Sequence, residues 1–242
     1  MNRTLKQIGA VALAVGMTTF AATSADAAVM TDLGWNDNDF WASPHDGNII
    51  STAEIRAETQ GNWEFGLWNG DSLGAQGDHT WNGFANFSLS YDADDTKLSL
   101  TLGGTAIDSF VDLGSAQTMF LRLRSDEEKN NQPNAQVSVK DLTLSGASLA
   151  GGTIESPLPH DPNSYYSNYW MISGFDIAAD WTLAGQVKIA DAVNQDSHTA
   201  MNVKISDVPP VPLPAAAWFM LTALGGLVGS RWLKGRTADQ AA

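Results

Sequence analysis

The chain has 242 residues and is acidic, with 27 Asp and Glu against 13 Lys and Arg, for a net charge of −14. A surface of that sign repels nucleic acid, so we expect no nucleic-acid partner. The sequence contains no cysteine, which excludes disulfides, cysteine-ligated metals, thiol catalysis and a lipid anchor on an N-terminal cysteine. The length leaves room for one domain with a substantial core, flanked by two terminal segments of different composition.

Residues 1–27 are predicted to be a signal peptide. Arg3 and Lys6 precede an apolar run over residues 8–22. Ala25 and Ala27 then supply small side chains at the spacing that a signal peptidase accepts. We therefore expect cleavage before Ala28, with residues 28–207 exported as the ectodomain. The alternative is a retained N-terminal anchor, but the apolar run is short for a membrane span.

The start of the ectodomain is rich in aromatic residues, and two of its tryptophans are candidates for ligand binding. Trp35 and Trp41 lie in a stretch dominated by Asp and Asn, where exposed rings that stack on sugars are often flanked by such polar groups. The alternative is that the aromatic residues fill the core, as most large aromatic side chains do. Trp63, Phe65 and Leu67 alternate with polar or small residues and are predicted to be buried.

Two clusters of aspartates are weak candidates for calcium, because this ion prefers several hard oxygen ligands close together. The first cluster comprises Asp37 and Asp39, and the second comprises Asp92, Asp94 and Asp95. Aspartates also occur at turns for backbone reasons alone, and that explanation is favoured for both clusters. We therefore expect no cofactor, with calcium as the open alternative.

Apolar residues in the ectodomain recur with a period of two, which is typical of β-strands. The clearest hairpin spans residues 84–102, with a polar turn at 92–95. Further strands are predicted over residues 49–55, 63–68, 119–124, 137–144, 170–177, 181–189 and 201–205. No stretch shows a sustained helical repeat. The pattern predicts an all-β fold: a single β-sandwich or jelly roll of roughly nine to eleven short strands.

Residues 70–74, Gly-Asp-Ser-Leu-Gly, match a signature of serine esterases. In those enzymes a strand turns sharply into a helix and exposes the serine oxygen beside an oxyanion hole. Here more glycines follow and no helical pattern does, so a glycine-rich turn between strands is favoured. We expect no catalytic residue, and an esterase built on Ser72 remains a remote alternative. The four histidines lack metal-binding spacing and are predicted to lie in surface loops.

Residues 208–242 combine a proline motif, an apolar helix and a basic end. The motif is Val211, Pro212, Leu213, Pro214 and Ala215. Residues 214–233, taken as a helix at ~1.5 Å per residue, span about 30 Å, which is enough to cross a membrane. The basic cluster consists of Arg231, Lys234 and Arg236, which we expect to remain on the cytoplasmic side.

This tail resembles the VPLPA variant of the PEP-CTERM sorting domain. The resemblance implies that an exosortase-type enzyme of the bacterial envelope processes the tail. Leu213 stands where the better-known motif has glutamate, which leaves the identity of the enzyme open. An ordinary membrane anchor that is never cut is the alternative. The body loosely resembles choice-of-anchor extracellular β domains, through the hairpin around residues 91–102 and through residues 170–176, and this resemblance implies no activity.

These observations favour a non-enzymatic exported protein of the cell envelope or extracellular matrix. It would first be anchored on the outer side of the cytoplasmic membrane, and then lie at the cell surface or in the matrix. The alternative function is a carbohydrate-binding module for exopolysaccharide.

Overall fold

The computed structural model describes residues 28–57, 63–125, 136–157, 166–190 and 199–210. The predicted signal peptide, including Ala25 and Ala27, lies outside the described residues. The sorting motif at 211–215 and the basic cluster also lie outside them. Within the part of the chain that is described, no helix is long and apolar enough to span a membrane.

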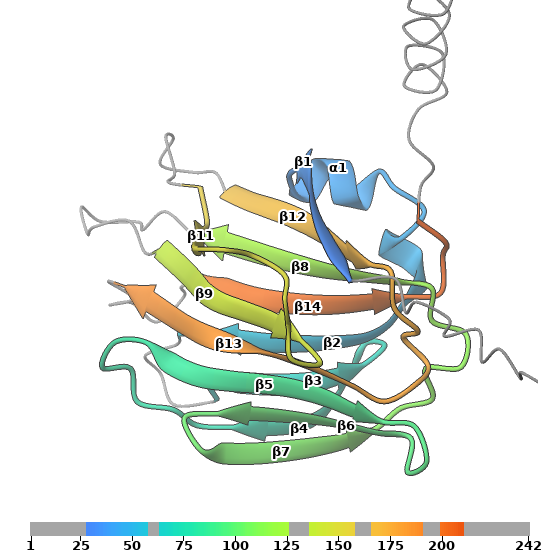
Figure 1. Cartoon of the computed structure of the whole chain (residues 1–242), viewed down its shortest axis with the longest axis horizontal. Helices are drawn as coiled ribbons and strands as arrows, with labels where there is room; N and C mark the ends of the chain where they lie inside the picture. The colour runs from blue at the N-terminus through green and yellow to red at the C-terminus, as the bar shows by residue number, and fades with distance from the viewer. Residues whose placement is uncertain (1–27, 58–62, 126–135, 158–165, 191–198, 211–242) are drawn as a thin grey trace, which may run out of the picture.

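Two antiparallel sheets of seven strands each pack face to face (Figure 1). Sheet A has the order β1 (Val29–Trp35), β12 (Tyr166–Ser173), β8 (Thr118–Ser125), β14 (Ala200–Ser206), β2 (Ile49–Arg56), β3 (Phe65–Asn69) and β4 (Ser72–Gly77). Sheet B has the order β10 (Ala147–Ser148), β9 (Gln136–Leu144), β13 (Trp181–Ala190), β5 (Ala85–Asp92), β6 (Lys97–Leu102) and β7 (Thr105–Phe110), and β11 (Thr153–Glu155) also pairs with β9. The predicted all-β class is confirmed.

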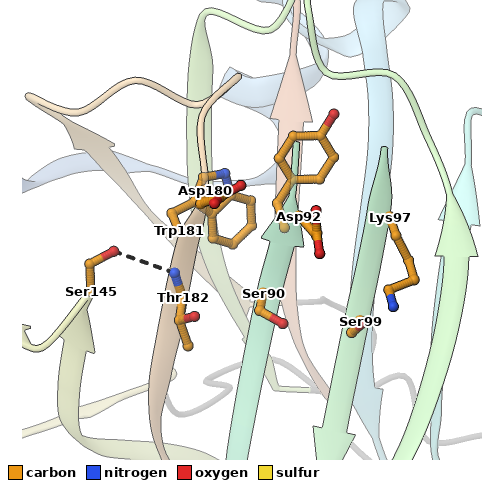
Figure 2. A pocket seen from close by; sticks show the side chains of 9 residues that line it. Ser90, Asp92, Lys97, Ser99, Ser145, Asp180, Trp181 and Thr182 are labelled. Carbon is orange, nitrogen blue, oxygen red and sulfur yellow. Dashed lines mark hydrogen bonds between the residues drawn. The ribbon is translucent and has the colours of Figure 1, made fainter. Parts of the chain in front are cut away.

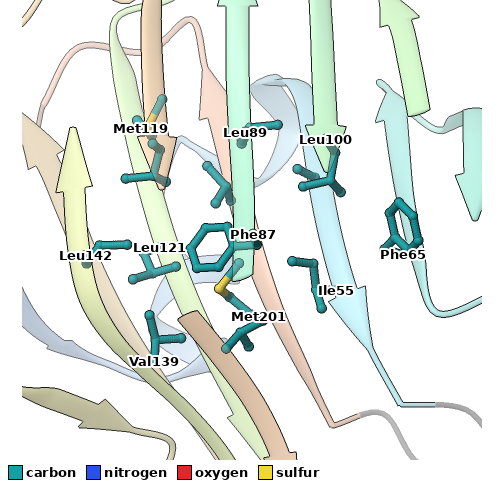
Figure 3. Close-up of a cluster of buried hydrophobic side chains, with 14 of the residues drawn as sticks. Ile55, Phe65, Phe87, Leu89, Leu100, Met119, Leu121, Val139, Leu142 and Met201 are labelled. Carbon is teal, nitrogen blue, oxygen red and sulfur yellow. The ribbon is translucent and has the colours of Figure 1, made fainter. Parts of the chain in front are cut away.

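The core lies between the sheets and is built from the inward-facing residues of strands that alternate with a period of two. Phe87 and Leu89 of sheet B face Leu121 and Met201 of sheet A across this layer (Figure 3). All four side chains are at most 3% exposed. The predicted burial of Trp63, Phe65 and Leu67 is also confirmed. Burial of such side chains, at roughly 1.5–3 kcal/mol each, is the main force that holds the two sheets together.

Strand β9 contains a bulge that its sequence pattern reflects. Val137 and Val139 are buried, and so are Leu142 and Leu144, although strict alternation would place the second pair on the outer face. The strand register shifts between Ala184 and Gln186 of the partner strand β13. Asp141, with φ of 55°, lies in the stretch where β9 has one more residue than β13. The extra residue returns the two leucines to the core.

The structure has more strands than the alternation predicted, and it contains helices. The described residues form fourteen strands, a short α-helix α1 (Asp37–Trp41) and a 3-10 turn, η1 (Asp46–Asn48). Five strands were not predicted, and none of them contains a buried residue: β1, β4, β7, β10 and β11. An edge strand with both faces partly exposed lacks the apolar alternation from which strands are predicted.

Candidate functional site

Helix α1 contains both residues of the first aspartate cluster, Asp37 and Asp39, and its local sequence explains why it forms. The Asn36 side chain accepts hydrogen bonds from the backbone N–H groups of Asn38 (2.8 Å) and Asp39 (3.2 Å). The Asp39 carboxylate accepts in return from the Asn36 backbone N–H at 3.0 Å. This reciprocal arrangement is a capping box. The calcium candidate Asp39 is thus a helix-capping residue in the structure.

Asp37 takes part in a buried network on the outer face of sheet A. Its carboxylate accepts hydrogen bonds from Nε of Arg122 at 2.8 Å and from the Tyr169 hydroxyl at 2.9 Å. It also pairs with Nη2 of the same arginine, whose Nη1 donates to Asn202 at 3.0 Å. The carboxylate oxygens of this calcium candidate are therefore occupied by protein donors.

Burial and the ion pair act in opposite directions on this carboxylate. Burial raises the pKa of Asp37, but the charge and hydrogen bonds of Arg122, with a further hydrogen bond from Tyr169, outweigh it and hold the pKa below its usual 3.8. Burial also raises the pKa of the Tyr169 hydroxyl, which remains protonated and donates to the carboxylate. The network thus contains an ionised Asp37 at neutral pH.

An aromatic cluster covers this network. One of the two tryptophans predicted to bind a ligand packs against the cluster, and the other is exposed. Phe40 stacks on Tyr169 at 4.7 Å between ring centroids and meets Phe120 edge-on at 5.5 Å. Trp35 stacks on Phe120 at 6.4 Å and is half-buried. Trp41, at the end of α1, is 55% exposed. Of this pair, Trp41 is the ring available to a ligand, and Trp35 contributes mainly to packing.

His45 is buried beside the same cluster, so the prediction that it lies in a surface loop is wrong. Its side chain is fully buried and meets Phe120 edge-on at 4.7 Å. Nδ1 lies 3.3 Å from the Ser206 hydroxyl, and Nε2 has no hydrogen-bond partner among the described residues. Burial lowers the pKa of His45 from its usual 6.5. Ser206 is far away in the sequence, so no local pattern could have indicated this contact.

The lowered pKa of His45 predicts that the protein loses stability in mild acid. The unfolded chain binds a proton at His45 near pH 6.5, whereas the folded chain resists it, so the free energy of unfolding falls as the pH drops through and below that value. The check is urea denaturation between about pH 7.5 and about pH 5. A His45→Phe variant should show a smaller loss. Since burial also lowers the pKa of His79, part of the loss should remain, and an unchanged loss in the variant would contradict the assignment to His45.

The esterase-like motif forms the turn of the β3–β4 hairpin. Gly70, with φ of 54°, lies in this turn, and Ser72 is the first residue of β4, paired with Asn69. A strand follows the serine, where the esterase motif requires a helix. The prediction of a glycine-rich turn between strands is confirmed.

The second aspartate cluster forms the turn of the β5–β6 hairpin. An oxygen of Asp92 accepts from the Asp95 backbone N–H at 3.1 Å, and an oxygen of Asp180 accepts from the Ala93 N–H at 2.8 Å. The Asp92 carboxylate thus stabilises the turn, to which Asp95 contributes its backbone N–H, and Asp94 lies between them. Across the described residues, no group of three or more His, Asp or Glu is placed to hold a metal ion.

Next to this turn, the outer face of sheet B is hollowed into an open groove of about 480 Å³ (Figure 2). Short hydroxyl side chains from three adjacent strands form its floor: Thr182 of β13, Ser90 of β5 and Ser99 of β6. Asp92, Lys97, Asp180 and Ser145 also line the groove, together with the buried residues Tyr91 and Trp181. This site was not predicted, because serines and threonines on the polar face of a strand are ordinary, and only the strand order brings these three together.

The chain matches no known family of proteins and no curated protein.

Proposed function

We propose that this chain is a non-enzymatic exported protein of the bacterial envelope or extracellular matrix, sorted through a PEP-CTERM-like C-terminal signal. In this proposal residues 1–27 are removed as a signal peptide. Residues 28–207 are then displayed as a jelly-roll-like ectodomain, and residues 208–242 form the sorting signal. The protein is first anchored on the outer side of the cytoplasmic membrane and is then transferred to the cell surface or the matrix by an exosortase-type enzyme.

The observation that carries the proposal is the order of features in the tail. A five-residue proline motif leads directly into an apolar segment, predicted to form a membrane helix over residues 214–233, and a basic end closes the tail. Each feature alone is common, but the three together form a compound signal. The acidic composition supports the proposal, because a high net charge keeps an exposed domain soluble. The hairpin at Ser72 supports it as well, since the esterase alternative needs a different local geometry.

The proposal predicts that location depends on the proline motif and not only on the membrane helix. Cells should be fractionated after making the full chain, a chain without residues 208–242, and a Pro212→Ala/Pro214→Ala variant. We expect the full chain at the cell surface or in the matrix, the truncated chain as a soluble exported protein, and the double variant held in the cytoplasmic membrane. A Pro209→Ala/Pro210→Ala variant is the matched control and should behave as the full chain. The same location for all four proteins would contradict the proposal.

The second candidate function is binding of carbohydrate, such as an exopolysaccharide of the matrix. The groove on sheet B favours it, because its floor presents hydroxyl groups from three neighbouring strands. A matrix protein with such a site would be attached to the cell at one end and to polysaccharide at the other.

A further inference from the structure

We propose that the groove on the outer face of sheet B binds a neutral polysaccharide chain, and that this groove, rather than Trp35 and Trp41, is the carbohydrate site. The inference deepens the carbohydrate-binding candidate and does not depend on how the tail is sorted.

The strand register places three short side chains next to one another on the groove floor. Thr182 is paired with Ser90, which is paired with Ser99, and all three face away from the core. Neighbouring strands lie about 4.8 Å apart, so Thr182, Ser90 and Ser99 offer three hydroxyl groups at a spacing similar to the size of a sugar ring.

The hollow arises because these side chains are short while their neighbours at one end of the strands are longer. Asp92 and Lys97 are paired across β5 and β6 at this end, and Asp180 lies beside them in the groove lining. The resulting volume, about 480 Å³, falls within the roughly 300–1,000 Å³ that is typical of ligand sites. Because the groove is open to solvent along the sheet, it suits a segment of a longer chain better than an enclosed small molecule.

The chemistry of the lining selects neutral polyhydroxylated ligands. Each serine or threonine hydroxyl both donates and accepts hydrogen bonds, as the hydroxyl groups of sugars do. The carboxylates of Asp92 and Asp180 outnumber the one ammonium group of Lys97, and the whole chain has a net charge of −14. An anionic polysaccharide would therefore be repelled.

An exposed aromatic ring lies next to the groove. Phe110 of β7 is paired with Lys97 and is 70% exposed. Its backbone is held by a hydrogen bond from Asn69 Nδ2 to its carbonyl oxygen at 3.2 Å. An exposed ring at this position can stack on the apolar face of a sugar at the edge of the groove.

The test is binding of the purified full chain, in mild detergent, to neutral glucans, mannans and xylans, with alginate and polygalacturonate as anionic comparators. Thr182→Val removes one hydroxyl and keeps the side-chain shape, so it should fold normally and weaken binding to the neutral glycan about fivefold. Ser99→Leu fills the groove and should weaken binding by about tenfold or more. Thr31→Val, on the exposed β1 strand, is the matched control and should bind as the wild type does.

Binding of at least one neutral glycan by the wild type, with weaker binding by Thr182→Val and Ser99→Leu, would support the groove as the carbohydrate site. The inference is overturned if no neutral glycan binds, if only the anionic glycans bind, or if both groove variants bind normally. Loss of binding in Trp41→Ala with normal binding in the groove variants would also overturn it, and would place the site on helix α1 instead. None of these results bears on the location experiment, so the two proposals fail separately.

Discussion

Replacing Asp37 with alanine is expected to lower the free energy of unfolding by about 3–5 kcal/mol. The reason is that the guanidinium group of Arg122, itself buried, would lose the carboxylate that neutralises it. Its remaining hydrogen bond to Asn202 carries no opposite charge. Urea denaturation at neutral pH, followed by circular dichroism or tryptophan fluorescence, measures the change.

Two further variants show whether the unpaired charge is the cause. Asp39→Ala, in the same helix, removes an exposed capping carboxylate and should cost about 0.5–1 kcal/mol. Asp37→Ala combined with Arg122→Met removes both charges and should recover much of the lost free energy of unfolding. The reason is that burying an apolar side chain at position 122 costs less free energy than burying an unpaired charge. If Asp37→Ala costs no more than Asp39→Ala, the buried ion pair does not anchor α1 on sheet A.

Replacing Phe87 with alanine is expected to cost a similar amount, about 3–5 kcal/mol, by a different mechanism. Phe87 is 3% exposed and lies at the centre of the core between the sheets (Figure 3). Its ring also packs on Gly185 of the neighbouring strand, where a Cβ atom would lie only 3.2 Å from it. Removing the ring therefore leaves a cavity that the paired backbone cannot close.

Phe110→Ala is the matched control, since the same side chain is lost from a position that is 70% exposed. It should change the free energy of unfolding by no more than about 0.5 kcal/mol. Both variants can be measured by the urea titration used for Asp37→Ala. Equal losses at the two positions would contradict the assignment of the core to the layer between the sheets.

The central strands could be predicted from the sequence because their inward residues are apolar and their outward residues are polar. The hairpin of β5 and β6 is the clearest case. The bulge at Asp141 is also visible in the sequence, because the spacing of the apolar residues of β9 shifts by one between Val139 and Leu142. The edge strands β4 and β7 could not be predicted in this way, since neither of them has a continuous buried face. Helix α1 is too short for a helical repeat, although Asn36 and Asp39 have the spacing of a capping box.

The candidate site depends on contacts between distant parts of the chain, which local patterns do not contain. Thr182 lies beside Ser90 only because β13 pairs with β5. Asp37 looked like a calcium ligand because its partner, Arg122, is 85 residues away. Exposure of Trp41 agrees with its polar surroundings in the sequence, whereas Trp35 is covered by residues that come later in the chain.

The most direct test of the proposed function is the intact mass of the mature protein isolated from its host. The proposal predicts a chain that begins at Ala28, is recovered from the cell surface or matrix, and ends at or near the proline motif at residues 211–215. A chain that retains residues 1–27 and 211–242 and is recovered from the cytosol would contradict both export and sorting.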